Sequence, residues 1–358
     1  MSNKLSELRD KIDTLDEQIQ GLITQRAQIA EEVAHAKLSS ENKTFYRAER
    51  ESEVLRRVMA RNKGPLSDEE MARLFREIMS ACLALERVMR IAFLGPEGTF
   101  TQAAALKHFG HSVQTLPQST ISDVFREVES GTASYGVVPV ENSTEGVVNH
   151  TLDEFMTSSL HICGEVDLRI HHHLLSNCSE LSQIKKIYSH RQSLAQCRKW
   201  INLNMSGCEL IDVNSNAEAA HLASEEDNVA AIAGDVAGEI YNLGVLARNI
   251  EDEPDNTTRF LVIGSRVTPP SGVDKTSFLI YTENKSGALY SMLEPIANNA
   301  LSMTRIESRP SRKGMWNYVF FIDIHGHVED DSVKRALSEL QQSTNIVKVL
   351  GSYPRAVL

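Results

Sequence analysis

The stretch LSELRDKIDTLDEQIQGLITQRAQIAEEVAHAKL, residues 5–38, decides the fold of the first part of this chain. Its apolar residues recur at alternating steps of three and four, a spacing that predicts one long helix with a continuous apolar seam. A helix over residues 4–38 would span roughly 50 Å, too long for one compact domain to cover. We therefore expect a second copy of the helix to pack against it in a homodimer. The seam consists of Leu5, Leu8, Ile12, Leu15, Ile19, Leu22, Ile29 and Val33.

Arg26 occupies the next step of this seam, where an apolar residue is expected. A buried cation without a partner is strongly destabilising. No acid lies three or four residues away on the helix, because those positions hold Leu22, Ile23, Ile29 and Ala30. We infer that Arg26 binds an anionic ligand; the alternative is that its side chain caps the helix or snorkels beside the seam.

Two further cations extend this interpretation. Lys37 follows Arg26 by eleven residues and, at about 100° per residue, returns to nearly the same face. Arg9 lies roughly 25 Å along the axis, so one helix cannot bring all three to one small ligand. A second chain could supply Arg9, which predicts a dimer with shared sites. The next two helices could add Arg50, Glu51, Cys82 and Glu86 to the pocket. The alternative is a charged helical hairpin that only dimerises.

Composition limits the function classes. The 358-residue chain has a net charge of −11, which argues against a nucleic-acid partner. No apolar run approaches the ~18 residues of a membrane span, and the charged N-terminus has no signal-peptide pattern. Five scattered cysteines without a C-x-x-C spacing are typical of reduced thiols. We expect a cytoplasmic protein with no membrane partner.

The pattern predicts three domains. Residues 1–90 are all-helical, and residues 91–267 repeat strand, glycine turn and helix, as in an α/β domain with a largely parallel sheet. Ligands of such a domain bind at the carboxyl ends of its strands. Residues 275–358 follow the strand and helix order βαββαβ, which is the ferredoxin-like arrangement.

Short polar loops in residues 91–267 are candidates for a binding site. Residues 95–101 and 141–146 each follow a strand and open a helix, so backbone N–H groups and hydroxyls there could hold a carboxylate. Neither loop has the glycine pattern of a nucleotide site. Residues 171–173 are three consecutive histidines, of which at most two could share a metal. We expect neither a metal nor a cofactor.

Together these stretches resemble the bifunctional chorismate mutase/prephenate dehydratase family over essentially the whole chain. The helical region is similar to the all-α mutase in Leu8-Arg9-Asp10-Lys11-Ile12, Arg26, Ala36-Lys37 and Glu49-Arg50-Glu51. The dehydratase resemblance lies in Gly95-Pro96-Glu97-Gly98-Thr99-Phe100, Val138-Pro139-Val140-Glu141-Asn142-Ser143 and Asn256-Thr257-Thr258-Arg259-Phe260. The C-terminal region resembles an ACT domain, with the phenylalanine-binding signatures Gly287-Ala288-Leu289 and Glu307-Ser308-Arg309-Pro310.

For the helical domain, the resemblance implies a pericyclic rearrangement of chorismate to prephenate. Arg26 and the partner's Arg9 would hold the two carboxylates, Lys37 would contact the ether oxygen and Glu51 the ring hydroxyl. Glu86 takes the position from which the family donates a hydrogen bond to the same ether oxygen, and a carboxyl group can donate only when protonated.

The sequence departs from the family pattern at two positions of this pocket. Arg47 stands where Asp is frequent, and Cys82 stands where Ser is frequent. These departures support an alternative in which only the dehydratase is active and the helical domain serves dimerisation.

For residues 91–267, the resemblance implies a two-lobed fold like that of periplasmic binding proteins, with the site in the cleft. Prephenate would lose carbon dioxide and its ring hydroxyl, giving phenylpyruvate. Thr258 would donate a hydrogen bond to the leaving hydroxyl. Arg259 would count among the substrate-binding residues because it positions the loop. Thr99, Asn142 and Ser143 would hold the carboxylates of the substrate.

The C-terminal signatures imply feedback inhibition by L-phenylalanine, bound at an interface between two such domains. A rival class is a solute-binding or regulatory protein without catalysis. Such a protein would not need Arg26, Lys37 and Arg50 in the helical seam, nor the hydroxyls of Thr257 and Thr258.

Overall fold

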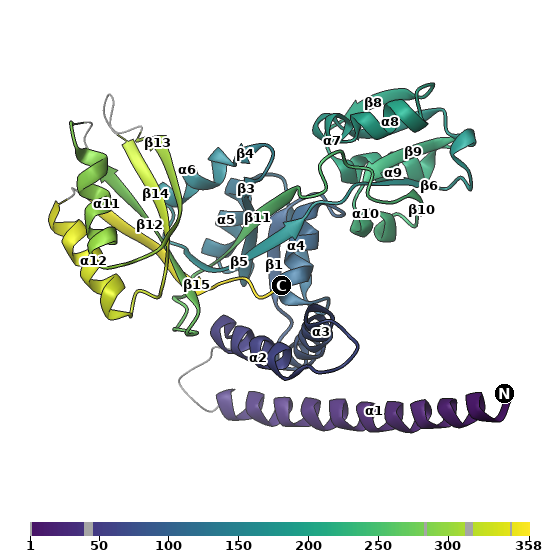
Figure 1. The fold of residues 1–358 in the computed structure, drawn as a ribbon, viewed down its shortest axis with the longest axis horizontal. Helices are drawn as coiled ribbons and strands as arrows, with labels where there is room; N and C mark the ends of the chain where they lie inside the picture. Colours follow the sequence, from purple (N-terminus) through teal and green to yellow (C-terminus); the bar gives the residue numbers. More distant parts are fainter. Residues whose placement is uncertain (1, 39–45, 283–284, 312–317, 344–345) are drawn as a thin grey trace.

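The computed structural model describes residues 2–38, 46–282, 285–311, 318–343 and 346–358, arranged as in Figure 1. Among these residues, no helix has both the length and the apolar character that crossing a membrane requires.

The described residues before position 90 form the predicted helical domain, with helices α1 (Ser2–Leu38), α2 (Ala48–Arg61) and α3 (Asp68–Glu86). The Ser67 hydroxyl caps α3 by accepting a hydrogen bond from the Glu70 N–H at 3.1 Å. Helix α3 packs against both α1 and α2.

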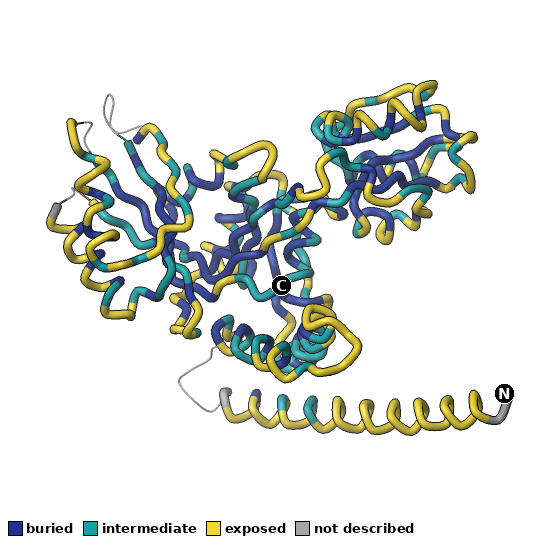
Figure 2. Tube along the Cα trace, viewed as in Figure 1, coloured by how far each residue is buried: buried dark blue, intermediate teal, exposed yellow. Residues whose placement is uncertain are grey.

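The apolar seam of α1 is exposed within the single chain. Residues 4–25 are exposed on all sides of the helix, and this half of α1 extends beyond α2 and α3 (Figures 1 and 2). Ile12 is 56% exposed and Leu22 is 65% exposed. A continuous row of exposed apolar side chains is typical of an interface.

Residues 90–264 form two α/β lobes. The sheet of the first lobe has the order β2-β1-β3-β11-β5, with β4 on β3. The sheet of the second lobe has the order β10-β6-β9-β7-β8. The first lobe contains β1 (Arg90–Leu94), α4 (Phe100–Phe109), β2 (Gln114–Gln118), α5 (Ile121–Glu129), β3 (Tyr135–Asn142), β4 (Gly146–Val147), α6 (Asn149–Thr157), β5 (His161–Arg169) and β11 (Thr257–Gly264). The second contains β6 (His173–Ser176), a 3₁₀ turn (Leu181–Gln183), β7 (Lys186–His190), α7 (Arg191–Gln196), α8 (Arg198–Asn204), β8 (Glu209–Val213), α9 (Asn216–Glu225), β9 (Val229–Ala233), α10 (Asp235–Ile240) and β10 (Gly244–Ala247).

The prediction of a largely parallel sheet is wrong. Strand β1 is parallel to β2 and β3, and β7 is parallel to β8 and β9. However, β11 is antiparallel to both β3 and β5, and β6 is antiparallel to β9 and β10. The chain leaves the first lobe after β5 and returns to it at β11, so the returning strand runs against its neighbours.

The C-terminal module has the predicted βαββαβ order. Its antiparallel sheet runs β13-β14-β12-β15, which leaves β13 as an edge strand. Helices α11 and α12 cover one face of this sheet (Figure 1). The elements are β12 (Asp274–Thr282), α11 (Ala288–Asn298), β13 (Met303–Pro310), β14 (Tyr318–His325), α12 (Asp331–Ser343) and β15 (Ile346–Pro354).

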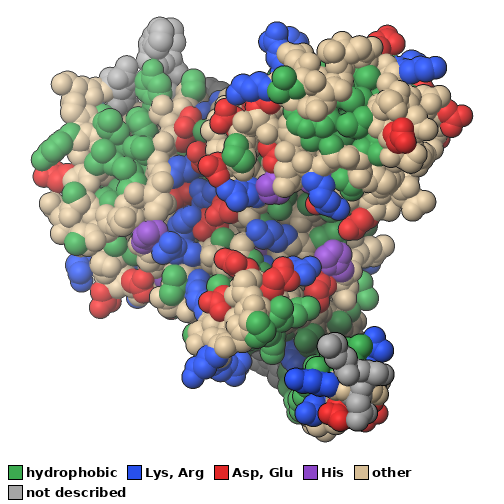
Figure 3. All heavy atoms as spheres, turned by 45° about the vertical axis from the view of Figure 1, so that its right-hand side comes forward, with side chains coloured by type: hydrophobic (Ala, Val, Ile, Leu, Met, Phe, Trp, Pro, Cys, Tyr) green, Lys and Arg blue, Asp and Glu red, His purple; other side chains and the backbone are tan. Residues whose placement is uncertain are grey.

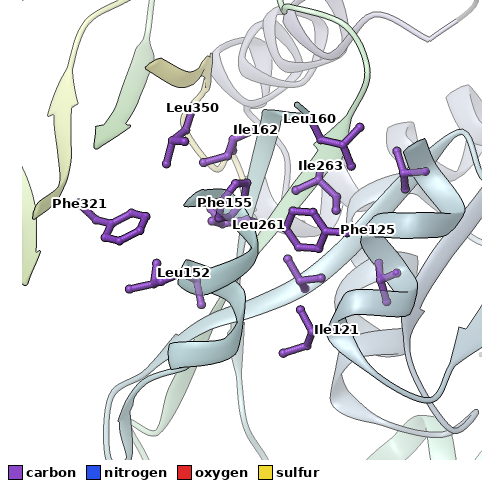
Figure 4. Packing of buried hydrophobic residues seen from close by; sticks show 14 of the residues in the cluster. Ile121, Phe125, Leu152, Phe155, Leu160, Ile162, Leu261, Ile263, Phe321 and Leu350 are labelled. Atoms are coloured by element: carbon purple, nitrogen blue, oxygen red, sulfur yellow. The ribbon is translucent and has the colours of Figure 1, made fainter. Parts of the chain in front are cut away.

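The other face of this sheet packs on the first lobe. Phe321 and Leu350 of the module share one apolar cluster with Phe155, Ile162 and Leu261 of the lobe (Figure 4). The module is therefore fixed to the lobe by a common core.

We predict that Phe321→Ala lowers the free energy of unfolding by about 3–5 kcal/mol, because the truncation leaves a cavity in this shared core. Phe321→Leu keeps most of the apolar volume and should cost less. Denaturant titration of both variants measures the difference. An unchanged value for the alanine variant would contradict the shared core.

Candidate active sites

The helical domain contains a cavity of about 450 Å³ between α1, α2 and α3. The three helices bring five predicted residues to this one pocket. Apolar side chains that include Val33, Val54, Met79 and Leu83 complete the wall. The predicted residues in the lining are Arg26, Arg50, Glu51, Cys82 and Glu86.

Arg9 and Lys37, which were also predicted for this pocket, are not among the residues that line it in the described part of the single chain. Arg9 is exposed on the half of α1 that extends beyond α3. The side chain of Lys37 lies outside the described residues. Arg47, which departs from the family pattern, also lines the pocket and pairs with Glu49 at 2.6 Å.

Glu51 has a buried partner that sequence reasoning missed. Arg76 on α3 pairs with it, with 3.3 Å between Nε and Oε1. Burial raises the pKa of the Glu51 carboxyl, and the Arg76 guanidinium opposes that rise. Arg76 also donates to the carbonyl oxygen of Lys107 at 2.7 Å, which ties the pocket wall to α4. The helical pattern gives no signal for this pair, because the partners lie on different helices.

A second cavity of about 390 Å³ lies between the two lobes. It is located at the carboxyl ends of β1, β3 and β7, the edge at which a ligand was predicted. Three predicted residues line it, namely Thr99, Asn142 and Thr258. No Lys or Arg is found among the described residues of its lining, where amide and hydroxyl groups predominate.

Asn142 orients Thr258 in this cleft. The Asn142 amide donates to the Thr258 hydroxyl oxygen at 2.7 Å and to Asn256 Oδ1 at 2.9 Å. Because the Thr258 oxygen accepts this bond, its own O–H proton is available for donation to a ligand. Thr258 is the second residue of β11, which begins at Thr257.

Ser143 and Arg259 are not placed in the lining of the cleft. The Ser143 hydroxyl accepts a hydrogen bond from the Thr257 N–H at 3.0 Å and thereby orders the loop. The guanidinium of Arg259 contacts Glu165 and Asp323 instead. The predicted substrate contact of Arg259 is therefore corrected, because alternate residues of a strand face opposite sides of the sheet.

Gln196, which sequence reasoning missed, bridges the lobes. From α7 of the second lobe it donates to the Thr144 hydroxyl of the first lobe at 3.2 Å. Its Oε1 lies 2.9 Å from Nε2 of His172, which also lines the cleft. Burial lowers the pKa of His172, so its imidazole is neutral near pH 7.

The three consecutive histidines have separate partners. His171 pairs with Glu251 at 2.7 Å, and His173 lies 3.1 Å from Asp235. In the described part of the chain, no three His, Cys, Asp or Glu side chains form a metal-binding group.

The C-terminal signatures lie on two elements of the module. Gly287 adopts a left-handed conformation (φ 81°) just before α11, which begins with Ala288 and Leu289. The residues Glu307, Ser308, Arg309 and Pro310 belong to the edge strand β13. Arg309 reaches the first lobe, where it pairs with Asp153 of α6 at 2.6 Å.

One domain has a cavity lined by arginines, and another has a cleft whose hydrogen-bond donors are mainly neutral amides and hydroxyls. The chain is therefore a multidomain protein with two sites for small polar ligands. The Chorismate mutase type II family matches residues 8–87, and the Prephenate dehydratase family matches residues 91–268. The chain belongs to the bifunctional chorismate mutase/prephenate dehydratase family and is an enzyme with both of these domains.

Individual relatives agree with this assignment. The bifunctional chorismate mutase/prephenate dehydratase of Stutzerimonas stutzeri is 56% identical over 362 residues, covering 100% of this chain and 99% of the relative. The prephenate dehydratase of Arthrobacter aurescens, solved in complex with L-Phe, has a TM-score of 0.69 and 35% identity. That match covers 75% of this chain and 90% of the other. GqqA, described as a novel type of quorum quenching acylase, has a TM-score of 0.70 and 31% identity, with 75% and 98% covered.

Proposed function

We propose that the chain converts chorismate to prephenate in the helical pocket and prephenate to phenylpyruvate in the cleft, under feedback inhibition by L-phenylalanine. The observation that carries the proposal is the convergence of Arg26, Arg50, Glu51 and Glu86 on one pocket. A pericyclic rearrangement needs no nucleophile, so fixed charges can stabilise its transition state.

The mutase site takes Arg9 from a second chain. Arg26 and the partner's Arg9 hold the two carboxylates of chorismate, with Arg50 and Cys82 in the binding wall. Lys37 contacts the ether oxygen, and Glu51 contacts the ring hydroxyl. The exposed seam of α1 supports this arrangement, because a second α1 would cover it and bring its own Arg9 along the helix.

In the cleft, the reaction breaks the bond between the ring and its carboxylate. The released electron pair makes the ring aromatic and expels the ring hydroxyl, which leaves as water once protonated. The hydrogen bond from Asn142 supports Thr258 as the donor to that hydroxyl. The two N–H groups of the Asn142 amide are taken by Asn256 and Thr258, so Asn142 orients Thr258 rather than holding a carboxylate. Thr99, in the lining of the cleft, is the proposed carboxylate contact, and Ser143 orders the loop.

The C-terminal module acts as an ACT domain. The signatures at residues 287–289 and 307–310 and the L-Phe complex of the Arthrobacter aurescens relative support phenylalanine as its ligand. An edge strand such as β13 offers unpaired backbone groups to a second module. Inhibition then requires that phenylalanine bind two states of the enzyme with different affinity.

The proposal is tested by supplying purified protein with chorismate alone and following chorismate, prephenate and phenylpyruvate, with and without L-phenylalanine. Formation of phenylpyruvate that phenylalanine suppresses is the expected result. Untouched chorismate with prephenate still consumed would indicate that only the dehydratase is active. No turnover of either substrate would favour the solute-binding alternative.

Replacing Thr258 with alanine should reduce dehydratase turnover by about 10²-fold, because the leaving hydroxyl loses its hydrogen-bond donor. Mutase turnover should not change. Thr257→Ala is the matched control, since that hydroxyl donates to the Asp255 carbonyl oxygen and lies outside the cleft lining. Parallel loss of both activities in Thr258→Ala would indicate misfolding instead.

Replacing Glu86 with alanine should lower mutase turnover, because the ether oxygen loses its proposed hydrogen-bond donor. The variant Glu86→Gln keeps an N–H donor at this position and should lose less turnover than Glu86→Ala. Initial rates of chorismate consumption measure both variants. Unchanged turnover in Glu86→Ala would contradict the role of Glu86.

Substitution of Glu307 or Ser308 should raise the phenylalanine concentration needed for inhibition, since both belong to the signature on β13. Dehydratase rates at increasing phenylalanine concentrations give the shift. Ser338→Ala, an exposed serine of α12, serves as the control. Full inhibition of the Glu307 and Ser308 variants at the original concentration would place the ligand elsewhere.

A further inference from the structure

Strands β3 and β11 join the cleft to the C-terminal module. They pair antiparallel, with Thr258 opposite Asn142 and Arg259 opposite Glu141. Thr258 and Asn142 line the cleft. Their neighbours Arg259 and Glu141 face the other side of the sheet, as the alternation of a strand requires, and both contact the module.

Residues of the module bind Arg259 in a buried network of hydrogen bonds and ion pairs. Arg259 Nη1 lies 2.6 Å from Asp323 of β14, and Nη2 donates to the Tyr353 hydroxyl of β15 at 3.0 Å. Its side chain is 14% exposed and that of Asp323 is 7% exposed. Ser277 donates to Asp323 at 2.5 Å, and Glu165 of β5 accepts from Arg259 Nε at 3.0 Å. Charge-assisted bonds of this kind fix geometry strongly.

The module also holds Glu141. Arg305 of β13 lies 3.0 Å from the Glu141 carboxylate, measured from Nε to Oε2. In the module sheet, Arg305 is the register partner of Asp323. Arg305 and Asp323 are therefore neighbours in the module, and their partners Glu141 and Arg259 are neighbours in the lobe. Each of the two pairs combines opposite charges. On the face in Figure 3, basic and acidic side chains are interspersed across the middle of the molecule.

Strand β13 connects this cluster with the phenylalanine signature. Arg305 lies two residues before Glu307 on the same strand, and both belong to one face of the sheet. A displacement of β13 would move Arg305 and with it the paired side chain of Glu141. A displacement of β14 would move Asp323 and with it the paired side chain of Arg259. Glu141 and Arg259 are each the immediate chain neighbour of a cleft residue.

We propose that Arg259 and Glu141 are positioning residues of the dehydratase site, through which the module sets the hydrogen bond between Asn142 and Thr258. Phenylalanine acts on the cleft through the pairs Arg305–Glu141 and Arg259–Asp323. The regulatory half of this inference rests on the proposed function of the module. The positioning half does not, because it concerns turnover without inhibitor.

The side chain of Glu141 is 42% exposed, so the Arg305–Glu141 pair allows a test with the full chain that leaves the side chains of Arg259 and Asp323 unchanged. The variants Glu141→Arg and Arg305→Glu each create a like-charge contact and should lower dehydratase kcat by about tenfold, with a smaller change in KM. The double variant Glu141→Arg/Arg305→Glu restores opposite charges and should recover most of the kcat. Mutase turnover in the same samples reports folding.

Arg126→Gln removes an exposed ion pair with Asp123 of the same lobe and is the matched control. An unchanged kcat in both single variants, or no recovery in the double variant, would overturn the positioning role.

Regulation is measured on the same variants. Calorimetry should show phenylalanine binding within about twofold of the unchanged protein, while maximal inhibition at saturating phenylalanine falls in the single variants. Retained maximal inhibition would overturn the coupling route. If the unchanged protein neither binds phenylalanine nor is inhibited by it, the proposed function of the module fails, and the kcat series still decides the positioning role.

Discussion

The pairing of β11 with β3 is the constraint on which the dehydratase part of the molecule depends. As the returning strand, β11 closes the first lobe after the chain has built the second, and so creates the cleft between them. Alternate residues of β11 face opposite sides of the sheet. Thr258 faces the cleft, while Leu261 packs into the core that the lobe shares with the module. One strand thus contributes both to the cleft and to the core shared with the C-terminal module, which makes independent movement of the two difficult.

The helical domain depends on a different constraint, the unsatisfied apolar seam of α1. A helix that exposes this much apolar surface within one chain needs a partner for stability. Under the proposed function, the same contact supplies Arg9 to the pocket of the other chain. Assembly and mutase catalysis would then be inseparable, whereas the cleft is built from residues of one chain.

Periodicity predicted the helices and the βαββαβ order, because both patterns are local. It also placed Arg26, Arg50, Glu51, Cys82 and Glu86 on helices that do form one pocket. Strand direction in the lobes could not be predicted, since it depends on where the chain re-enters the sheet. The face of Arg259 depends on register, and the contacts of Arg76 and Gln196 join residues far apart in sequence. Such long-range partners leave no local signal.

The two cavities differ in charge in a way that suits the two proposed reactions. Rearrangement of chorismate retains both carboxylates, so arginines in the helical pocket can hold them through the transition state. The second reaction discharges a carboxylate as carbon dioxide leaves. A cation paired with that group would stabilise the ground state more than the transition state and would slow the reaction. Neutral hydroxyl and amide donors, the groups that predominate in the lining of the cleft, bind a carboxylate less strongly than a guanidinium does. The lining of the cleft, in which the described residues include no Lys or Arg, therefore fits decarboxylation better than a second arginine pocket would.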